Sequence, residues 1–377
     1  MVVDGTGEAS GRQRCRDFRV KTYDLIVIGA GPSGSTCAAL CAEAGMKVLL
    51  LDASRFPRDK VCGDCLNPEA WPVLNRLEVV SQVHSLPQST PKWIRFSVEG
   101  HRAVTFPLNC GKNIFAIRRR DFDDLLAKRA IELGTHFQDG SRVTELRKLA
   151  DCWEVMTSAE TVGRAPRIVA SDGRNSIVAR QLGMHPPPLR DLRIGTQTHL
   201  SHPPGFDGSL EMHIYRNGYG GLADLGNGVA NLCLVANAGR LSELKDEAMT
   251  RYQVRESVSW RSISPIGRKR ARCLYHDGVF LSGDAASVVE PFTGQGISLA
   301  LRCGAILSDI LISRTGLEAG EAYRIAHQDI YRHGLWINHF TRFLSQHPRL
   351  THLLGPLLLK QPGLLSFMLY NVLQITA

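Results

Sequence analysis

What the sequence lacks narrows its function. It has no long lysine or arginine run and no basic stripe interleaved with aromatic residues, so nucleic-acid binding is not expected. No apolar stretch reaches the length expected of a membrane-spanning helix. Residues 1–21 are polar and arginine-rich, without the apolar centre of a secretory signal. We expect these residues to be a disordered leader and the protein to be cytoplasmic, with association to a membrane surface as the alternative.

A disulfide or metal framework is also missing. The ten cysteines are scattered, and several fall in apolar helix or strand patterns, which is typical of reduced thiols. Cys62 and Cys65 form a C-x-x-C pair, but a zinc site needs a second pair at metal spacing, which the chain does not have. The pair is therefore a redox dithiol, part of a purely structural loop, or part of a loop over a cofactor. We favour the cofactor loop and expect no metal.

The remaining composition is that of an ordinary globular protein, with 44% hydrophobic and 21% charged residues. A chain of 377 residues is long for one core, so two lobes are expected. The net charge of +9 suits anionic cofactors or an acidic membrane surface, although a solvated basic surface is the simpler explanation.

The most informative stretch runs from Tyr23 to Asp52. The apolar run from Leu25 to Ile28 predicts a buried strand, and an alanine- and leucine-rich helix and a second buried strand follow it. The second strand ends at Asp52, where a carboxylate can bind a ribose hydroxyl. Between first strand and helix, three glycines would permit a tight turn, the approach of a pyrophosphate and close helix packing: Gly29, Gly31 and Gly34. This β-α-β unit predicts a dinucleotide site without deciding between a nicotinamide and a flavin.

A second lobe is expected from two separated stretches. Residues 91–107 predict a hairpin, and residues 186–269 contain strand-like runs at short, regular spacing, which favours an antiparallel sheet. The first lobe would then comprise residues 22–90, 108–185 and 270–312, followed by a helical region at 313–377. Residues 353–370 are markedly apolar and could pack on the core, cover the pocket, bind a partner or lie on a bilayer surface, of which we favour core packing.

Two further loops follow predicted strands, where ligands bind in open α/β sheets, and they begin at Asp172 and at Gly283. A third loop, rich in glycine and proline, begins at Pro291 and leads into a predicted helix at Ile297. The start of that helix would stabilise negative charge, which suits a flavin ring that becomes anionic on reduction. Arg119 stands at the entrance of another predicted helix, where it could meet a phosphate or ribose.

Together these motifs resemble the class of two-domain FAD-dependent oxidoreductases that includes para-hydroxybenzoate hydroxylase-type hydroxylases, geranylgeranyl reductases and flavin-dependent halogenases. The resemblance covers Thr22 to Ile312. It rests on the glycine motif with Asp52, the R-x-x-F-D run at Arg119, D-G-R-N-S at Asp172, and G-D-A-A with P-F-T-G-Q-G after Gly283. It implies an α/β fold: a Rossmann-like FAD-binding domain of the glutathione-reductase type, with an inserted antiparallel β-sheet substrate domain and C-terminal helices.

The resemblance also implies which residues bind FAD. Asp284 would bind the ribitol, the loop from Pro291 would lie beside the flavin ring, and Cys62 would lie near that ring as the candidate catalytic residue. The full set of expected FAD-binding residues is Gly29, Gly31, Pro32, Ser33, Gly34, Asp52, Ala53, Arg58, Cys62, Gly63, Arg119, Val143, Asp172, Gly173, Gly283, Asp284, Pro291, Thr293, Gly294, Gln295, Gly296 and Ile297.

The branch of the class is harder to assign. The segment from Phe56 to Pro68 is most similar to the reductase and halogenase branches. However, the reductases' Y-x-W-x-F-P signature is expected near Tyr219, where this chain has G-Y-G-G-L-A-D-L, and the halogenases' W-x-W-x-I-P is absent. His199, His213 and Tyr215 lie on the predicted pocket sheet, where we expect structural rather than catalytic roles.

The leading functional prediction is therefore a flavoprotein monooxygenase that uses a flavin C4a-(hydro)peroxide on a small-molecule or lipid-like organic substrate. NAD(P)H or a separate reductase would donate the electrons. The first alternative is a geranylgeranyl-reductase-like C=C reductase, and the second is an FAD-binding maturation partner that acts on another protein. The sequence makes no prediction of oligomeric state.

Overall fold

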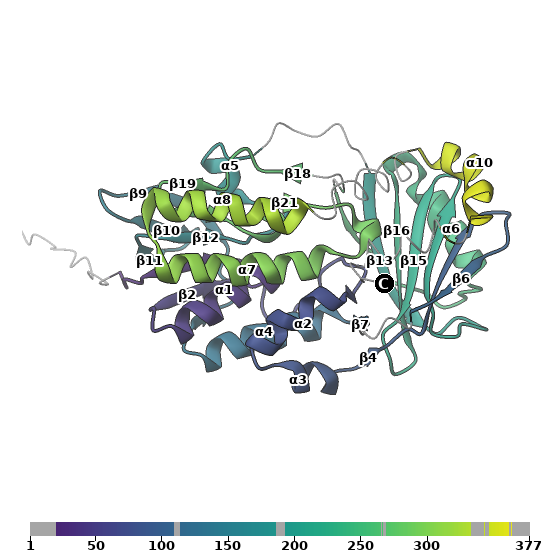
Figure 1. Ribbon diagram of the computed structural model, residues 1–377, viewed down its shortest axis with the longest axis horizontal. Coiled ribbons are helices and arrows are strands. Elements are labelled where there is room, and N and C mark those ends of the chain that lie inside the picture. Colours follow the sequence, from purple (N-terminus) through teal and green to yellow (C-terminus); the bar gives the residue numbers. More distant parts are fainter. Residues whose placement is uncertain are drawn as a thin grey trace, which may run out of the picture.

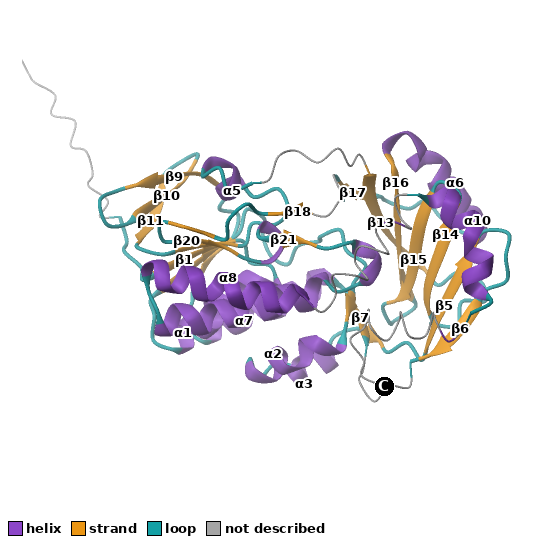
Figure 2. Cartoon of the chain, turned by 45° about the horizontal axis from the view of Figure 1, so that its top comes forward, coloured by secondary structure: helices purple, strands orange, loops and turns teal. Residues whose placement is uncertain are grey.

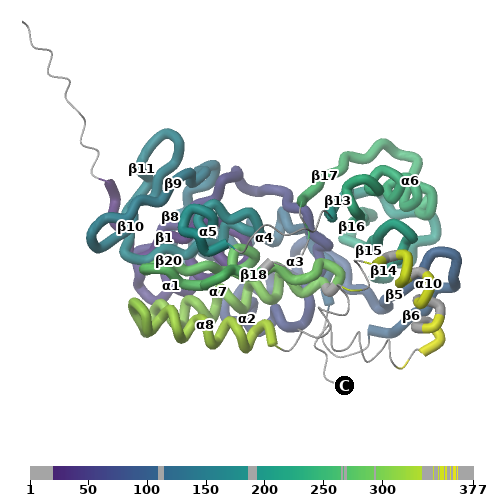
Figure 3. Tube along the Cα trace, turned by 90° about the horizontal axis from the view of Figure 1, so that it is seen from above, coloured from purple at the N-terminus to yellow at the C-terminus, as the bar shows by residue number. Residues whose placement is uncertain are grey.

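The computed structural model describes residues 20–108, 114–185, 193–264, 266, 269–332, 343, 347–361 and 363. Figure 1 shows two lobes lying end to end along the longest axis of the molecule. Figure 3, viewed from above, shows that each lobe contains segments of several colours, so both are built from separate stretches of the chain. The chain therefore passes between the lobes several times.

The first lobe is organised around a six-stranded sheet with the order β19-β20-β12-β1-β2-β8. Its neighbours pair in parallel, apart from the antiparallel β19–β20 pair at one edge. The central strands are short, apolar and buried, as expected when both faces of a parallel sheet are covered. The strands are β1 (Leu25–Ile28), β2 (Val48–Leu51), β8 (His136–Gln138), β12 (Ile168–Ala170), β19 (Tyr275–His276) and β20 (Val279–Leu281).

Helices and a small sheet cover this central sheet. Helix α1 contacts both α4 and α7, and α7 contacts α8. A three-stranded sheet packs on β1 through its strand β11, and its apolar residues join the same core. The bounds are α1 (Pro32–Glu43), α4 (Arg119–Glu132), α7 (Gly296–Ser313), α8 (Gly316–Arg332), β9 (Val143–Lys148), β10 (Trp153–Thr157) and β11 (Thr161–Ala165). Within this small sheet, β9 and β10 pair as antiparallel neighbours.

Helix α7 is long and apolar enough to cross a membrane by length and composition, the one such helix among the residues described above. The expectation that no apolar stretch reaches this length is therefore wrong. Most of the helix is buried, with α1 and α8 packed against it. Its apolar residues thus belong to the core of the first lobe, which explains their number without a bilayer.

The second lobe contains a seven-stranded sheet with the order β17-β13-β16-β15-β14-β5-β6. The predicted hairpin at 91–107 is confirmed by the antiparallel pair β5–β6. The expectation of a purely antiparallel sheet is wrong at one place, because β14 and β5 are parallel. Parallel neighbours need a long crossover, and the chain makes one through the first lobe between these strands. The strands are β5 (Trp93–Val98), β6 (Val104–Pro107), β13 (Arg193–Ser201), β14 (Leu210–Tyr215), β15 (Gly218–Asp224), β16 (Val229–Asn237) and β17 (Arg261–Ile263).

Two helices accompany this sheet. Helix α6 (Leu241–Arg251) contacts β16, and helix α10 (Pro348–Leu359) contacts β14 and β5. Figure 2 shows both helices at the outer end of the second lobe, on the side away from the first lobe. The opposite side of the sheet therefore remains available to face the first lobe.

Short elements connect the lobes and frame the region between them. A small sheet of order β3-β7-β4 lies near the junction in Figure 1. The remaining bounds are β3 (Cys65–Leu66), β4 (Gln88–Ser89), β7 (Phe115–Ile117), β18 (Lys269–Arg270), β21 (Ser287–Val288), α2 (Trp71–Arg76), α3 (Val80–Ser85) and α5 (Ile177–Gln181), with 3-10 turns η1 (Pro68–Ala70), η2 (Ala238–Arg240), η3 (Gly283–Ala285) and η4 (Pro291–Thr293).

Candidate functional site

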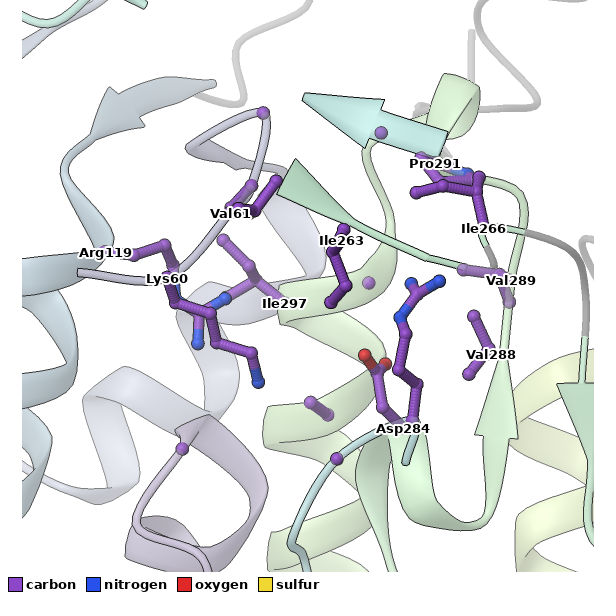
Figure 4. Close-up of a pocket in the computed structure, with 18 of the residues that line it drawn as sticks. Lys60, Val61, Arg119, Ile263, Ile266, Asp284, Val288, Val289, Pro291 and Ile297 are labelled. Atoms are coloured by element: carbon purple, nitrogen blue, oxygen red, sulfur yellow. The ribbon is translucent and has the colours of Figure 1, made fainter. Parts of the chain in front are cut away.

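A cavity of about 180 Å³ lies between the lobes and takes its walls from both. The first lobe supplies the glycine turn after β1, the loop around Cys62 and the start of α7, while the second supplies parts of β13, β16 and β17. Figure 4 shows the side chains of Lys60 and Asp284 pointing into the same space. The predicted FAD-binding residues that line the cavity are Gly31, Pro32, Ser33, Cys62, Gly63, Arg119, Gly173, Gly283, Asp284, Pro291, Gly294, Gly296 and Ile297.

The glycine turn has the geometry of a phosphate cradle. Gly29 has a φ of +101°, which disfavours any side chain, and a Cβ on Gly34 would overlap the carbonyl oxygen of Gly29. A Cβ on Gly31 would instead lie 3.9 Å from Arg58, an ordinary contact distance on the cavity side. Gly29 and Gly34 therefore allow the turn to pack, while Gly31 keeps the start of helix α1 open to an anion.

Asp52 ties the end of β2 to this turn. Its Oδ2 accepts a hydrogen bond from the backbone N–H of Ala30 at 2.9 Å, and its Oδ1 accepts one from Ser54 at 2.9 Å. Arg58 also reaches Oδ2, at 3.3 Å. The carboxylate thus stands beside the glycine turn, just outside the cavity wall, with exposed Ala53 next to it.

Basic side chains gather on the same side of the cavity. The guanidinium of Arg119 donates two hydrogen bonds to the carboxylate of Asp123, from Nε to Oδ1 at 2.7 Å and from Nη2 to Oδ2 at 2.8 Å. Arg58 forms an ion pair with the same carboxylate at 3.1 Å. Burial alone would lower the pKa of Arg119, but the pairing with Asp123 raises it. Burial, and then the charge of Arg119, lower the pKa of Lys60. A cluster of positive charge beside an open helix start fits the diphosphate of FAD.

Among the wall residues that sequence reasoning missed are three with polar or ionisable side chains, namely Lys60, Arg174 and Cys233. Lys60 lies two residues before Cys62 in the segment that carries the resemblance, and Arg174 follows Asp172 in the D-G-R-N-S motif, so both could have been selected as cations near phosphates. Cys233 lies in an ordinary strand pattern, and nothing local marks it.

The loop around Cys62 is fixed to the sheet of the second lobe. The backbone N–H of Cys62 donates a hydrogen bond to Oε1 of Gln197 at 3.1 Å. Its carbonyl oxygen accepts hydrogen bonds from the side-chain amide of Asn231 and from the thiol of Cys233, both at 3.0 Å. Strands β13 and β16 thereby hold this loop at the cavity, although their contacting residues lie 135 or more positions later in the sequence.

Three thiols line the cavity, and burial keeps all of them protonated. Burial raises the pKa of Cys62, although the guanidinium of Arg119 opposes this shift. Burial raises the pKa of Cys65 to about 12 and that of Cys233 well above its ordinary value. These groups are therefore weak acids rather than nucleophilic thiolates at neutral pH.

Asp64 forms the centre of the network behind the loop. Its Oδ2 accepts hydrogen bonds from the side-chain amides of Gln197 at 3.0 Å and Asn231 at 2.9 Å, and His199 lies 3.4 Å away. Burial raises the pKa of this carboxyl group, with the contact to His199 opposing the shift. His199 also lies 3.0 Å from Arg118, so it belongs to this supporting network.

His213 and Tyr215 form a second polar group that is not part of the cavity wall. Nδ1 of His213 lies 2.6 Å from the hydroxyl of Ser97, and its ring meets that of Tyr215 edge to face. Both side chains are buried.

Several other predicted residues lie outside the cavity lining. Oδ2 of Asp172 accepts a hydrogen bond from the N–H of Ile177 at 2.8 Å, so this carboxylate holds the first turn of α5. Val143 is buried in β9, in the core beneath the small sheet. Gln295 is buried immediately before α7, and Thr293 ends the short turn η4.

The start of helix α7 reaches the cavity. The helix begins at Gly296, and Gly296 and Ile297 both line the wall. Gly294, with a φ of +65°, turns the chain between η4 and the helix. The positive end of the α7 dipole therefore faces the same space as Asp284 and the loop around Cys62, where it favours a negatively charged group.

Curated relatives align with most of the chain. A menaquinone reductase of Mycolicibacterium smegmatis is 27% identical over 376 residues, spanning 91% of this chain and 89% of that protein. A digeranylgeranylglycerophospholipid reductase of Methanocaldococcus jannaschii is 26% identical over 315 residues, spanning 76% of each.

Solved structures agree on the fold. The flavin-dependent brominase Bmp2 has a TM-score of 0.74 at 18% identity and covers 94% of both chains. P. aeruginosa PqsL, in complex with 2-aminobenzoylacetate, has a TM-score of 0.74 at 17% identity, covering 87% of this chain and 98% of that one. A family model described as FAD binding domain matches residues 22–195 and 237–323. The matched residues include the glycine turn after β1, the basic side chains from Arg58 to Arg119 and the start of α7. The chain belongs to the FAD binding domain family.

Proposed function

We propose that this FAD-dependent oxidoreductase reduces a carbon–carbon double bond of an isoprenoid lipid. The observation that carries the proposal is the combination of an aliphatic cavity wall with a protonated thiol, Cys62, beside it. When bound, reduced FAD supplies the hydride for such a reaction. The residues of the chain then have to bind the alkene, exclude water and deliver one proton.

The wall opposite the basic cluster suits an aliphatic substrate. It contains Leu234 and Val235 of β16, Ile263 of β17, Ile266, and Val288 of β21. Apolar side chains of this kind bind a branched hydrocarbon chain by burial and keep water from the reacting carbons. Figure 4 shows Ile263, Ile266 and Val288 at the cavity, across from Lys60.

Cys62 is the proton donor in this proposal. Reduction of C=C places a hydride on one carbon and a proton on the other, so a neutral acid must stand at the reacting face. The thiol of Cys62 is held protonated by burial, and the guanidinium of Arg119 would stabilise the thiolate that remains after transfer. The thiolate then regains a proton from water, which balances the reaction.

The names of the relatives support the substrate class. Menaquinone and digeranylgeranylglycerophospholipid are both isoprenoid lipids, and the proteins named for them are both reductases. The missing aromatic signature near Tyr219 indicates a substrate-binding surface that differs from that of the geranylgeranyl reductases.

A product assay tests the proposal. The purified, FAD-loaded protein is reduced without oxygen, by NADH, NADPH or dithionite, and mixed with geranylgeraniol or a short-chain menaquinone, and the products are analysed by mass spectrometry. The proposal predicts the gain of two hydrogens per reduced bond. Products that gain an oxygen atom only when air is admitted would instead establish the monooxygenase predicted from the sequence. If the protein binds FAD but leaves both the lipids and any aromatic substrates chemically unchanged, the result would favour the maturation partner.

A further inference from the structure

Helix α10 carries a row of exposed leucines. Leu350, Leu353, Leu354 and Leu357 follow the i, i+3, i+4, i+7 spacing of a single helix face. Their side chains are 38%, 71%, 42% and 61% exposed, whereas Thr351 is 2% exposed. A stripe with this spacing normally faces a core, but here it faces solvent while the other side of the helix contacts β14 and β5.

Positive charge accompanies this apolar face. Arg349 and Lys360 are exposed, one near each end of the helix. From residue 333 to residue 377 the sequence contains no aspartate or glutamate, although it contains three arginine or lysine residues. Figures 1 and 2 both place α10 at the outer end of the second lobe, remote from the first lobe. The face is therefore apolar, flanked by cations and not covered by the first lobe.

We propose that α10 docks this protein on the surface of an anionic lipid bilayer, with the four leucines among the acyl chains and Arg349 and Lys360 at the headgroups. This position goes beyond the proposed reaction. Leucines beside basic residues are the composition of helices that lie in the bilayer interface, where each cation adds to the attraction of anionic lipid. Protein–protein interfaces depend instead on tryptophan, tyrosine and arginine anchors, and leucine is under-represented among them.

Vesicle sedimentation tests the proposal with the full-length, FAD-loaded protein. Binding is compared between vesicles of phosphatidylcholine alone and vesicles that also contain phosphatidylglycerol. We expect binding to the anionic vesicles that weakens as salt screens the cations. The Leu353→Glu/Leu357→Glu double variant is expected to lower the partition coefficient by at least about tenfold, because two buried leucine side chains are replaced by charges.

Leu317 offers a matched control, because it is 81% exposed on α8, a different helix. Leu317→Glu should bind vesicles as the wild type does. An equal loss of vesicle binding in the double variant and in Leu317→Glu, or no loss in the double variant, would overturn the proposal. So would a change from dimer to monomer in the double variant by light scattering, because the covering surface would then be a second copy of the chain. FAD content and reduction of a short, water-soluble prenyl substrate should stay at wild-type levels in all variants, which separates this test from that of the reaction.

Discussion

Arg193 and Glu290 form a two-point ion pair inside the protein, with each carboxylate oxygen 3.1 Å from a guanidinium nitrogen. Their side chains are 4% and 1% exposed. Arg193 begins β13 in the second lobe, whereas Glu290 immediately precedes the loop from Pro291 to the start of α7. The hydroxyl of Tyr219 also donates to Glu290, at 2.9 Å. The pair therefore joins the seven-stranded sheet of the second lobe to the loop that borders the cavity.

Replacing Arg193 with methionine should destabilise the protein strongly. The substitution leaves the Glu290 carboxylate buried without this ion pair, and breaking a buried pair from one side typically costs about 3–5 kcal/mol. Urea unfolding followed by circular dichroism measures the loss. The Arg193→Met/Glu290→Leu double variant is the control, since it removes both charges and should recover much of the lost stability. A single variant as stable as the wild type would contradict the importance of the pair.

The glycine turn provides a prediction that separates folding from cofactor binding. Gly34→Ala should destabilise the protein, because the new Cβ would overlap the carbonyl oxygen of Gly29. Gly31→Ala should fold normally, because its Cβ would lie at an ordinary 3.9 Å from Arg58. It should nevertheless weaken FAD binding by about tenfold or more, the cost of one lost hydrogen bond to a charged phosphate. Flavin fluorescence titration and urea unfolding of both variants would show the difference, and normal FAD affinity in Gly31→Ala would place the phosphates elsewhere.

The first lobe was largely predictable because its signals are local. Apolar runs, turn glycines and helical spacing lie within about 30 residues of each other, as in the unit from Tyr23 to Asp52. The helix predicted to begin at Arg119 is α4 (Arg119–Glu132). It needed only its own sequence to be recognised.

The parts that sequence analysis missed depend on distant residues. The parallel pairing of β14 with β5 joins Leu210 to Ile94, and nothing near either strand specifies that neighbour. The network around Asp64 likewise takes Gln197 and Asn231 from strands more than 130 residues away. Motif positions were a better guide to which residues line the cavity than to what each side chain contacts, as Asp172 shows by holding a helix end.

His327 predicts a specific loss of stability in acid. It is buried between Tyr323 and Tyr331, and burial, followed by the charge of Arg270, lowers its pKa to about 4 from the usual 6.5. The unfolded chain therefore binds a proton more readily than the folded one below pH 6.5. The free energy of unfolding is therefore unaffected by this group above pH 6.5 and decreases as the pH falls towards 4. The decrease is about 3 kcal/mol in total, at about 1.4 kcal/mol per pH unit.

Urea unfolding at a series of pH values checks this dependence. His327→Phe keeps an aromatic ring in the cluster but cannot bind the proton, so its stability relative to the wild type should improve as the pH falls from 6.5 to 4. His276 is exposed on β19, and His276→Gln should follow the wild-type curve. Parallel curves for wild type and His327→Phe would mean that this ring titrates normally in the folded protein.

Cys62 supplies the sharpest test of the proposed proton transfer. Cys62→Ala removes the thiol while the backbone groups that bind Gln197 and Asn231 remain, so the loop and the FAD content should be preserved. Loss of a general acid typically slows turnover by about 10²–10⁴-fold, and we expect this for single-turnover reduction of the alkene. Cys65 is the matched control, since its thiol also lines the cavity but its pKa is raised to about 12, and Cys65→Ala should keep most of the rate. In deuterated water, wild-type product should carry one solvent deuterium on the carbon that accepts the proton. Unchanged rates in Cys62→Ala would assign that proton to another group at the cavity.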